Sequence, residues 1–180
     1  MLTLLVVGDE YYNEATQEFN TFDDVVLELE HSLVSLSKWE SIHNKPFLSE
    51  KPKTSEEIMS YISCMILSPI FPGGILDRLS SANVESVNDY IESKQTATTF
   101  GDMPSRKGRG EVITSELIYY WMVAFTIPFE CETWHLNRLF ALIRICNIKN
   151  QPAKKLSKSE IARRNRELNE RRKAEFGTTG

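Results

Sequence analysis

The chain has 180 residues, of which 41% are apolar and 26% charged, an ordinary globular composition that excludes a disordered or fibrous protein. This length fits one domain with an appendage, and it can bury a core without disulfides or metals. The charges are divided unevenly: residues 151–180 carry nine Lys or Arg and four Asp or Glu, and the rest of the chain carries twelve and twenty-one. A basic tail on an acidic body indicates either an arm that meets an acidic or anionic surface or a solvated helix with many ion pairs.

Neither a secretory signal nor a membrane span is predicted. The N-terminal apolar run ends at Val7 and lacks positive residues before it. The longest charge-free run, between Glu116 and Glu130, is shorter than the roughly 20 residues that a span needs, so we interpret it as a buried helix. The three cysteines cannot all pair within one chain, and no CxxC or CxxH spacing is present. We therefore expect free thiols and a cytoplasmic protein.

Residues 1–30 are predicted to form a small antiparallel β-sheet or hairpin. Turn-like residues at Gly8-Asp9 and at 13–16 separate its apolar segments. The clearest strand covers residues 25–30, where one face carries Val25, Leu27 and Leu29 and the other carries Val26, Glu28 and Glu30. This period of two is typical of a half-buried strand.

Residues 31–150 are predicted to form a helical core, which makes the protein mainly α, with an α+β arrangement. The first helix, in the sequence HSLVSLSKWESIHN, is expected to point Leu33, Leu36 and Ile42 inward, with Trp39 near that face. Thr54 and Glu57 are spaced as a capping box that opens a second helix. Further helices are expected over Val84–Ser93 and Ser115–Thr126, and a loop over about 101–110. We interpret His31 and His43 as hydrogen-bonded structural histidines.

The segment CETWHLNRLFALIRICNIKN, residues 131–150, contains the candidate residues for a catalytic or metal-binding site. As one helix it has two apolar arcs separated by a polar stripe of Asn137 and Arg144, which indicates a helix buried on two sides. The arcs are Leu136, Leu139, Phe140 and Ile143 on one side, and Trp134, Ala141, Leu142 and Ile145 on the other.

Candidate catalytic and metal-binding residues in this segment are Cys131, His135 and Cys146. Cys131 and His135 are four residues apart, and a position near the helix start can lower a thiol pKa, but no orienting group or oxyanion hole is recognisable. Cys146 is too far along the helix to share an ion with His135. The segment SRKGRGE also lacks the ending of a phosphate-binding loop. We predict no catalytic residues, no metal site, no cofactor and no enzyme activity.

Residues 151–180 are predicted to form a basic C-terminal helical arm. A capping box at 157–160 starts its helix, Gly177 ends it, and its apolar stripe is too thin to build a core. Such a helix docks on the body, pairs with another chain or folds on a partner. Clustered arginines also fit nucleic acid, but the single aromatic residue and the acidic body argue against it. The predicted partner-binding residues are Lys154, Lys155, Ile161, Arg163, Arg164, Leu168, Arg171 and Arg172.

Three blocks, at residues 29–48, 111–150 and 154–173, resemble a family of small proteins of long-tailed bacteriophages. They include the motifs WHLNRL and TSELIYYWM. Members of this family are described as tail assembly chaperones or as tail-region proteins encoded near the tape-measure protein. The resemblance covers most of the chain and is weakest at residues 5–24, 68–80 and 100–110.

The resemblance implies a non-enzymatic chaperone that binds aggregation-prone segments of the tape-measure protein in the host cytoplasm. It carries no residue-level motif for binding, so the partner-binding residues come from charge and apolar spacing alone. The alternatives are a structural protein of the virion tail or head-tail connector and, third, a nucleic-acid-binding factor. A homo-oligomer is compatible with the sequence, and no membrane partner is expected.

Overall fold

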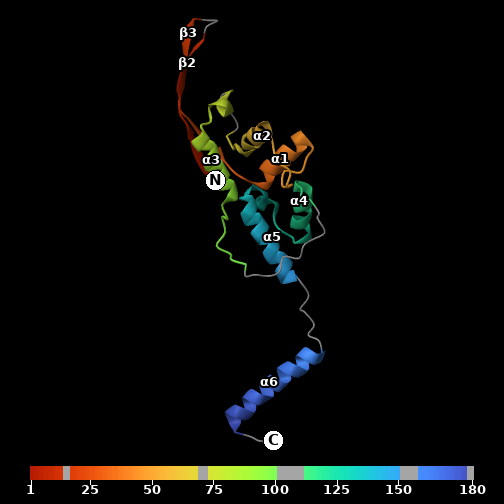
Figure 1. Ribbon diagram of the computed structural model, residues 1–180. Coiled ribbons are helices and arrows are strands. Elements are labelled where there is room, and N and C mark those ends of the chain that lie inside the picture. The colour runs from red at the N-terminus through yellow and green to blue at the C-terminus, as the bar shows by residue number, and fades with distance from the viewer. Residues whose placement is uncertain (14–16, 69–72, 101–111, 151–157, 178–180) are drawn as a thin grey trace. The chain divides into compact units, whose positions relative to one another are not determined.

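The computed structural model describes residues 1–13, 17–68, 73–100, 112–150 and 158–177 (Figure 1). In this part of the chain the protein is mainly helical with short N-terminal antiparallel strand pairs, which confirms the predicted α+β class. The chain divides into two units, Met1–Asn147 and Ile148–Gly180. Within the described ranges, no helix is long and apolar enough to cross a bilayer.

The four strands form two antiparallel pairs nested along one hairpin. The outer pair is β1 (Leu2–Val6) with β4 (Val25–Leu29), and the inner pair is β2 (Asp9–Asn13) with β3 (Glu18–Phe22). In the outer pair Leu27 and Leu29 are buried while Val26 and Glu28 are exposed, so the predicted alternation is confirmed. Glu30, predicted on the outer face, is buried instead, because β4 ends at Leu29 and the Tyr90 hydroxyl donates to Glu30 Oε1 at 2.7 Å.

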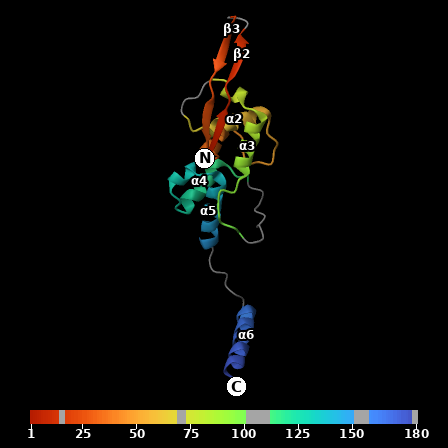
Figure 2. The same ribbon diagram turned by 90° about the vertical axis from the view of Figure 1, so that its left-hand side faces the viewer.

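Gly8 separates the two strand pairs. Its N–H donates to Asp24 Oδ1 at 2.6 Å, and a Cβ at this position would collide with the Phe22 carbonyl oxygen. Only glycine permits this close approach of the two chain segments. Figure 2 shows the β2–β3 ribbon continuing past this joint, and at its base the Arg78 guanidinium lies over the Phe22 ring at 4.8 Å.

Local capping signals set where the first helices begin. Ser32 caps α1 (Leu33–His43), and Thr54 with Glu57 forms the predicted capping box of α2 (Ser55–Met65). The helix α3 (Ser81–Glu92) begins three residues before its predicted start, because Ser80 and Asn83 also form a capping box. Asn83 stands where a capping box usually has Glu or Gln, so the sequence pattern does not predict this cap.

The remaining helices are α4 (Ser115–Ala124), α5 (Leu136–Asn150) and α6 (Lys158–Phe176), with 3₁₀ turns η1 (Ile75–Arg78) and η2 (Phe129–Thr133). Gly177 ends α6 with a positive φ of 62°, as predicted. The predicted loop at 101–110, the turn at 14–16 and the cap residue Ser157 lie outside the described residues.

Two apolar clusters form the core, and α1 contributes to both. Trp39 joins the cluster between the β1–β4 pair, α2 and α3, whereas Leu33 and Leu36 join the cluster of α4, η2 and α5. Accordingly, α1 packs against both α2 and α4 (Figure 1). The prediction that Ile42 points inward is wrong: its side chain is 62% exposed, because nine residues at about 100° each place it on the opposite side of α1 from the buried Leu33.

The buried carboxylate of Glu40 connects α1 to two other segments. Its Oε1 accepts from the Phe47 N–H at 2.9 Å, in the loop after α1. Its Oε2 accepts from the Ser115 N–H at 2.7 Å, at the first residue of α4. Burying a charge costs free energy unless donors compensate it, and both donors here are backbone groups held by the fold.

We expect Glu40→Ala to lower the free energy of unfolding by about 3 kcal/mol, because two buried N–H groups lose their acceptor. Urea unfolding followed by circular dichroism measures the change. The matched control is Glu85→Ala on the exposed face of α3, which should change stability little. Equal effects of the two substitutions would show that the Glu40 bridge does not hold α4.

Candidate partner-binding surfaces

A buried polar cluster lies where the end of β4 meets the start of α5. The Leu136 N–H donates to the His31 carbonyl at 2.7 Å, which draws the two segments together. The His31 and His135 rings then lie 5.1 Å apart between centroids. His31 Nδ1 is 2.6 Å from the Tyr61 hydroxyl, and His135 Nε2 is 3.0 Å from the Tyr90 carbonyl oxygen.

The electrostatics of this cluster favour neutral imidazoles. Burial lowers the pKa of His31 to about 4, and the neighbouring His135 adds to the effect. Burial also lowers the pKa of His135, although the hydrogen bond to the Tyr90 carbonyl opposes the shift. His43, in turn, lies 2.9 Å from Ser60 Oγ. The prediction that His31 and His43 are hydrogen-bonded is therefore confirmed.

The structure corrects the geometry predicted for Cys131 and His135. Cys131 lies in η2, Trp134 is extended, and α5 begins only at Leu136, so these two residues do not share a helix face. The effect of a helix start on the thiol pKa is not found here either, because burial raises the pKa of Cys131 and Glu130 adds to the shift. In the ranges that the structure describes, no group of three His, Cys, Asp or Glu side chains is placed to hold a metal ion.

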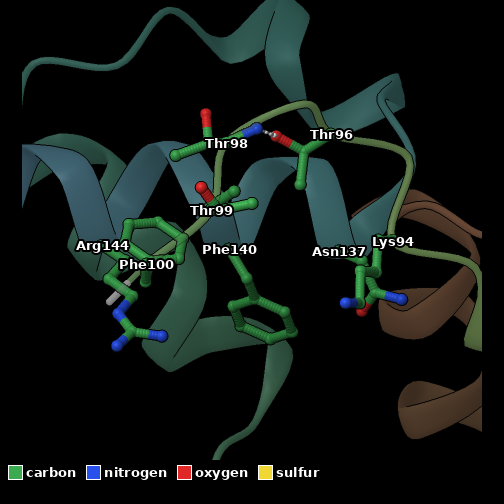
Figure 3. A pocket seen from close by; sticks show the side chains of 9 residues that line it. Lys94, Thr96, Thr98, Thr99, Phe100, Asn137, Phe140 and Arg144 are labelled. Carbon is green, nitrogen blue, oxygen red and sulfur yellow. Dashed lines mark hydrogen bonds between the residues drawn. The ribbon is translucent and has the colours of Figure 1, made fainter. Parts of the chain in front are cut away.

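A groove of about 470 Å³ lies over α5, on the polar stripe predicted from its sequence. The extended segment after α3 forms one wall, and Asn137, Phe140 and Arg144 form the floor (Figure 3). The Arg144 guanidinium lies over the Phe100 ring at 4.1 Å. The Asn137 amide already donates to the carbonyls of Ile91 and Ser93. The polar groups of this groove therefore hold the segment after α3 in place.

The predicted partner-binding residues fall on α6, whose described side chains are all exposed. The aliphatic stripe consists of Ile161 and Leu168, which are 45% and 43% exposed. Arg164 is three residues after Ile161 and four before Leu168, so it borders this stripe. Arg171 and Arg172, three and four residues after Leu168, border its C-terminal half in the same way. Lys154 and Lys155, also predicted to bind a partner, lie outside the described residues.

Arg163 occupies a different face of α6. It is two residues from Ile161, and its Nε pairs with Glu167 Oε1 at 3.7 Å, an i,i+4 ion pair between exposed side chains. Exposed pairs of this kind contribute little to stability. Arg166 is likewise two residues from Leu168 and lies away from the stripe.

A second exposed surface was not predicted. The charge-free run containing α4 was interpreted as a buried helix, and Ile118 and Met122 are indeed fully buried. Tyr120 and Val123, however, are 65% and 62% exposed, and Phe129 in η2 is also exposed. Helical spacing places Tyr120 and Val123 opposite Ile118 and Met122. Because the run is apolar on all sides, however, the sequence does not show which of these two faces is buried.

We name Tyr119, Tyr120, Val123 and Phe129 the α4 patch. Tyr120 and Val123, three residues apart, share the outward face of α4, and the half-buried Tyr119, which also packs against the second core cluster, lies at its edge. The Tyr119 and Phe129 rings lie 6.4 Å apart, which joins η2 to this face. The Tyr119 hydroxyl donates to Glu132 Oε2 at 2.8 Å, so a carboxylate borders the patch.

Comparison with known proteins does not extend this description. A scan of protein-family models, a search of curated protein sequences and a search of solved structures each gave no match. The resemblance to phage tail-region proteins therefore stays a prediction, and α6 and the α4 patch carry the functional argument.

The histidine cluster should make stability depend on pH. A buried histidine with a lowered pKa binds its proton mainly after unfolding, so it favours the folded state above the ordinary pKa of 6.5. That stability should fall as the pH drops from about 6.5 towards 4, by as much as about 3 kcal/mol for His31.

Urea unfolding between pH 7 and pH 5, where most carboxylates stay ionised, measures this dependence. The variant His31→Gln should flatten the slope, whereas the control His43→Gln should retain it. A wild-type slope in His31→Gln would contradict the assignment.

Proposed function

We propose that this protein is a non-enzymatic tail assembly chaperone of a long-tailed bacteriophage. It acts in the host cytoplasm, and its arm α6 binds helical segments of the tape-measure protein. The observation that carries the proposal is the exposed Ile161–Leu168 stripe of α6 with arginines along both of its borders. The three sequence blocks that resemble phage tail-region proteins supply the biological setting.

The physical case begins with the low intrinsic stability of such a helix. A helix of 19 residues rich in charged side chains, whose described side chains are all exposed, gains little from packing. A partner that covers Ile161 and Leu168 supplies the missing apolar contact, as when an amphipathic helix binds a groove or another helix. Arg164, Arg171 and Arg172 then meet acidic residues on that partner and speed the encounter.

The cysteine and histidine environments support a non-enzymatic role. Cys131 is buried with a raised pKa, which opposes the thiolate that nucleophilic catalysis requires. His31 and His135 face tyrosine and backbone groups inside the core. Through these contacts both histidines connect β4, α2, α3 and α5 within the core.

Charge reversal on the two faces of α6 tests the binding surface. We expect Arg164→Glu with Arg172→Glu to weaken tape-measure binding at least tenfold, because both residues border the stripe. Arg163→Glu with Arg166→Glu changes the net charge equally on another face and should have a smaller effect. The measurement is the fraction of tape-measure protein kept soluble by co-expression, with binding to its purified segments. Equal losses in both variants would mean that only total charge matters.

The abundance of the protein in purified phage particles tests the chaperone role. Quantitative mass spectrometry should find it in infected-cell lysate and not in mature particles, because a chaperone leaves before the particle is complete. A fixed copy number in particles would instead identify a tail or connector component. Tight DNA binding with a steep dependence on salt would favour the nucleic-acid alternative.

A further inference from the structure

The α4 patch has the chemistry of a protein-binding surface. Tyr120, Val123 and Phe129 are mostly exposed in it, and the half-buried Tyr119 ring borders them. Aromatic side chains are enriched at the centres of protein interfaces because they bury large areas at a low entropy cost. Ile42, an exposed aliphatic residue on α1, belongs to neither core cluster and offers a reference for a single exposed residue.

The charge around the patch selects a cationic partner. Residues 112–137 contain three carboxylates, at Glu116, Glu130 and Glu132, and no Lys or Arg, while the guanidinium of the next residue, Arg138, lies over the Trp134 ring. Glu116 lies one turn before Tyr120 on the same helix face, and Glu132 holds the Tyr119 hydroxyl. An apolar face bordered by carboxylates fits an apolar stripe bordered by cations.

The arm of the same chain has that complementary chemistry. Ile161 and Leu168 are seven residues apart, which is about 10.5 Å along a helix; on α4 the patch from Tyr119 to Val123 covers about 6 Å, and the Glu116 carboxylate lies beyond its N-terminal end. Arg164 and Arg172 border the stripe and can pair with carboxylates or stack on tyrosine rings. The two surfaces therefore match in apolar character and charge.

We propose that α6 of one copy docks on the α4 patch of a second copy of this protein. Because the two surfaces differ, the contact is heterologous, and each end of the assembly keeps an arm or a patch available for another copy. The copies then associate head to tail. Pairing between two α6 helices is less favourable, since each helix carries seven Lys or Arg against four Glu.

This inference does not depend on the phage assignment. It concerns only the purified protein, so self-association and tape-measure binding can fail separately. If both occur, the Ile161–Leu168 stripe is used in each, and the client must displace a neighbouring copy from the arm. The proposed function then predicts that tape-measure segments dissociate the self-assembled protein.

Two complementary variants of the full chain test the docking. Tyr120→Ala with Val123→Ala removes the patch, and Ile161→Gln with Leu168→Gln removes the stripe; all four new residues favour helix. We expect wild type to associate with rising concentration in sedimentation velocity, and each variant to dissociate at least tenfold more readily. An equimolar mixture should form a 1:1 heterodimer that grows no further, because only one intact patch and one intact stripe can meet. Raising the salt concentration should weaken that heterodimer.

Controls separate the alternatives. Circular dichroism and thermal melting check that both variants fold, and Ile42→Ala should associate like wild type. A wild type that stays monomeric to near-millimolar concentration overturns the proposal. A patch variant that associates like wild type would show pairing through α6 alone, and it would also overturn the docking. So would an equimolar mixture of the two variants that stays monomeric at concentrations where wild type associates.

Discussion

The buried Glu40 carboxylate is the constraint on which the arrangement of the helical core depends. A carboxylate removed from water needs hydrogen-bond donors, and Glu40 takes them from the Phe47 and Ser115 amides. These amides belong to the loop after α1 and to the start of α4. One side chain thus fixes where α4 begins relative to α1, and through it which face of α4 meets the core and which carries Tyr120.

The sequence predicted the elements whose signals are local. The alternation at residues 25–29 and the Thr54–Glu57 cap need only neighbouring residues, and both features were found where expected. The buried states of Glu30 and Glu40 depend on partners far along the chain, so no local pattern announces them. The start of α5 was misplaced because Trp134 is extended: the His31 carbonyl takes the Leu136 amide, and the helix begins only at that residue.

The two candidate surfaces differ in the same way: one follows from neighbouring residues in the sequence, and the other depends on tertiary packing. The Ile161–Leu168 stripe and its arginines follow from helical spacing, because the described part of α6 has no buried face to override the pattern. The α4 patch was hidden because the run is apolar all round, and only the packing of Ile118 and Met122 shows which residues point outward. Acidic residues lie beside this patch and basic residues beside the stripe, so the uneven charge of the chain is expressed as two complementary surfaces.

The joint at Gly8 has a consequence for the order in which the protein opens. A two-stranded ribbon without a covering layer is marginally stable, and Tyr12, Glu18 and Phe19, in the part of β2–β3 away from Gly8, are exposed to water. Leu4 and Leu27, beyond the joint, belong to the core cluster of α2 and α3. The β2–β3 pair can therefore open and close independently of the core, so its amide hydrogens should exchange fast. The amides of the β1–β4 pair should exchange only when the core opens cooperatively.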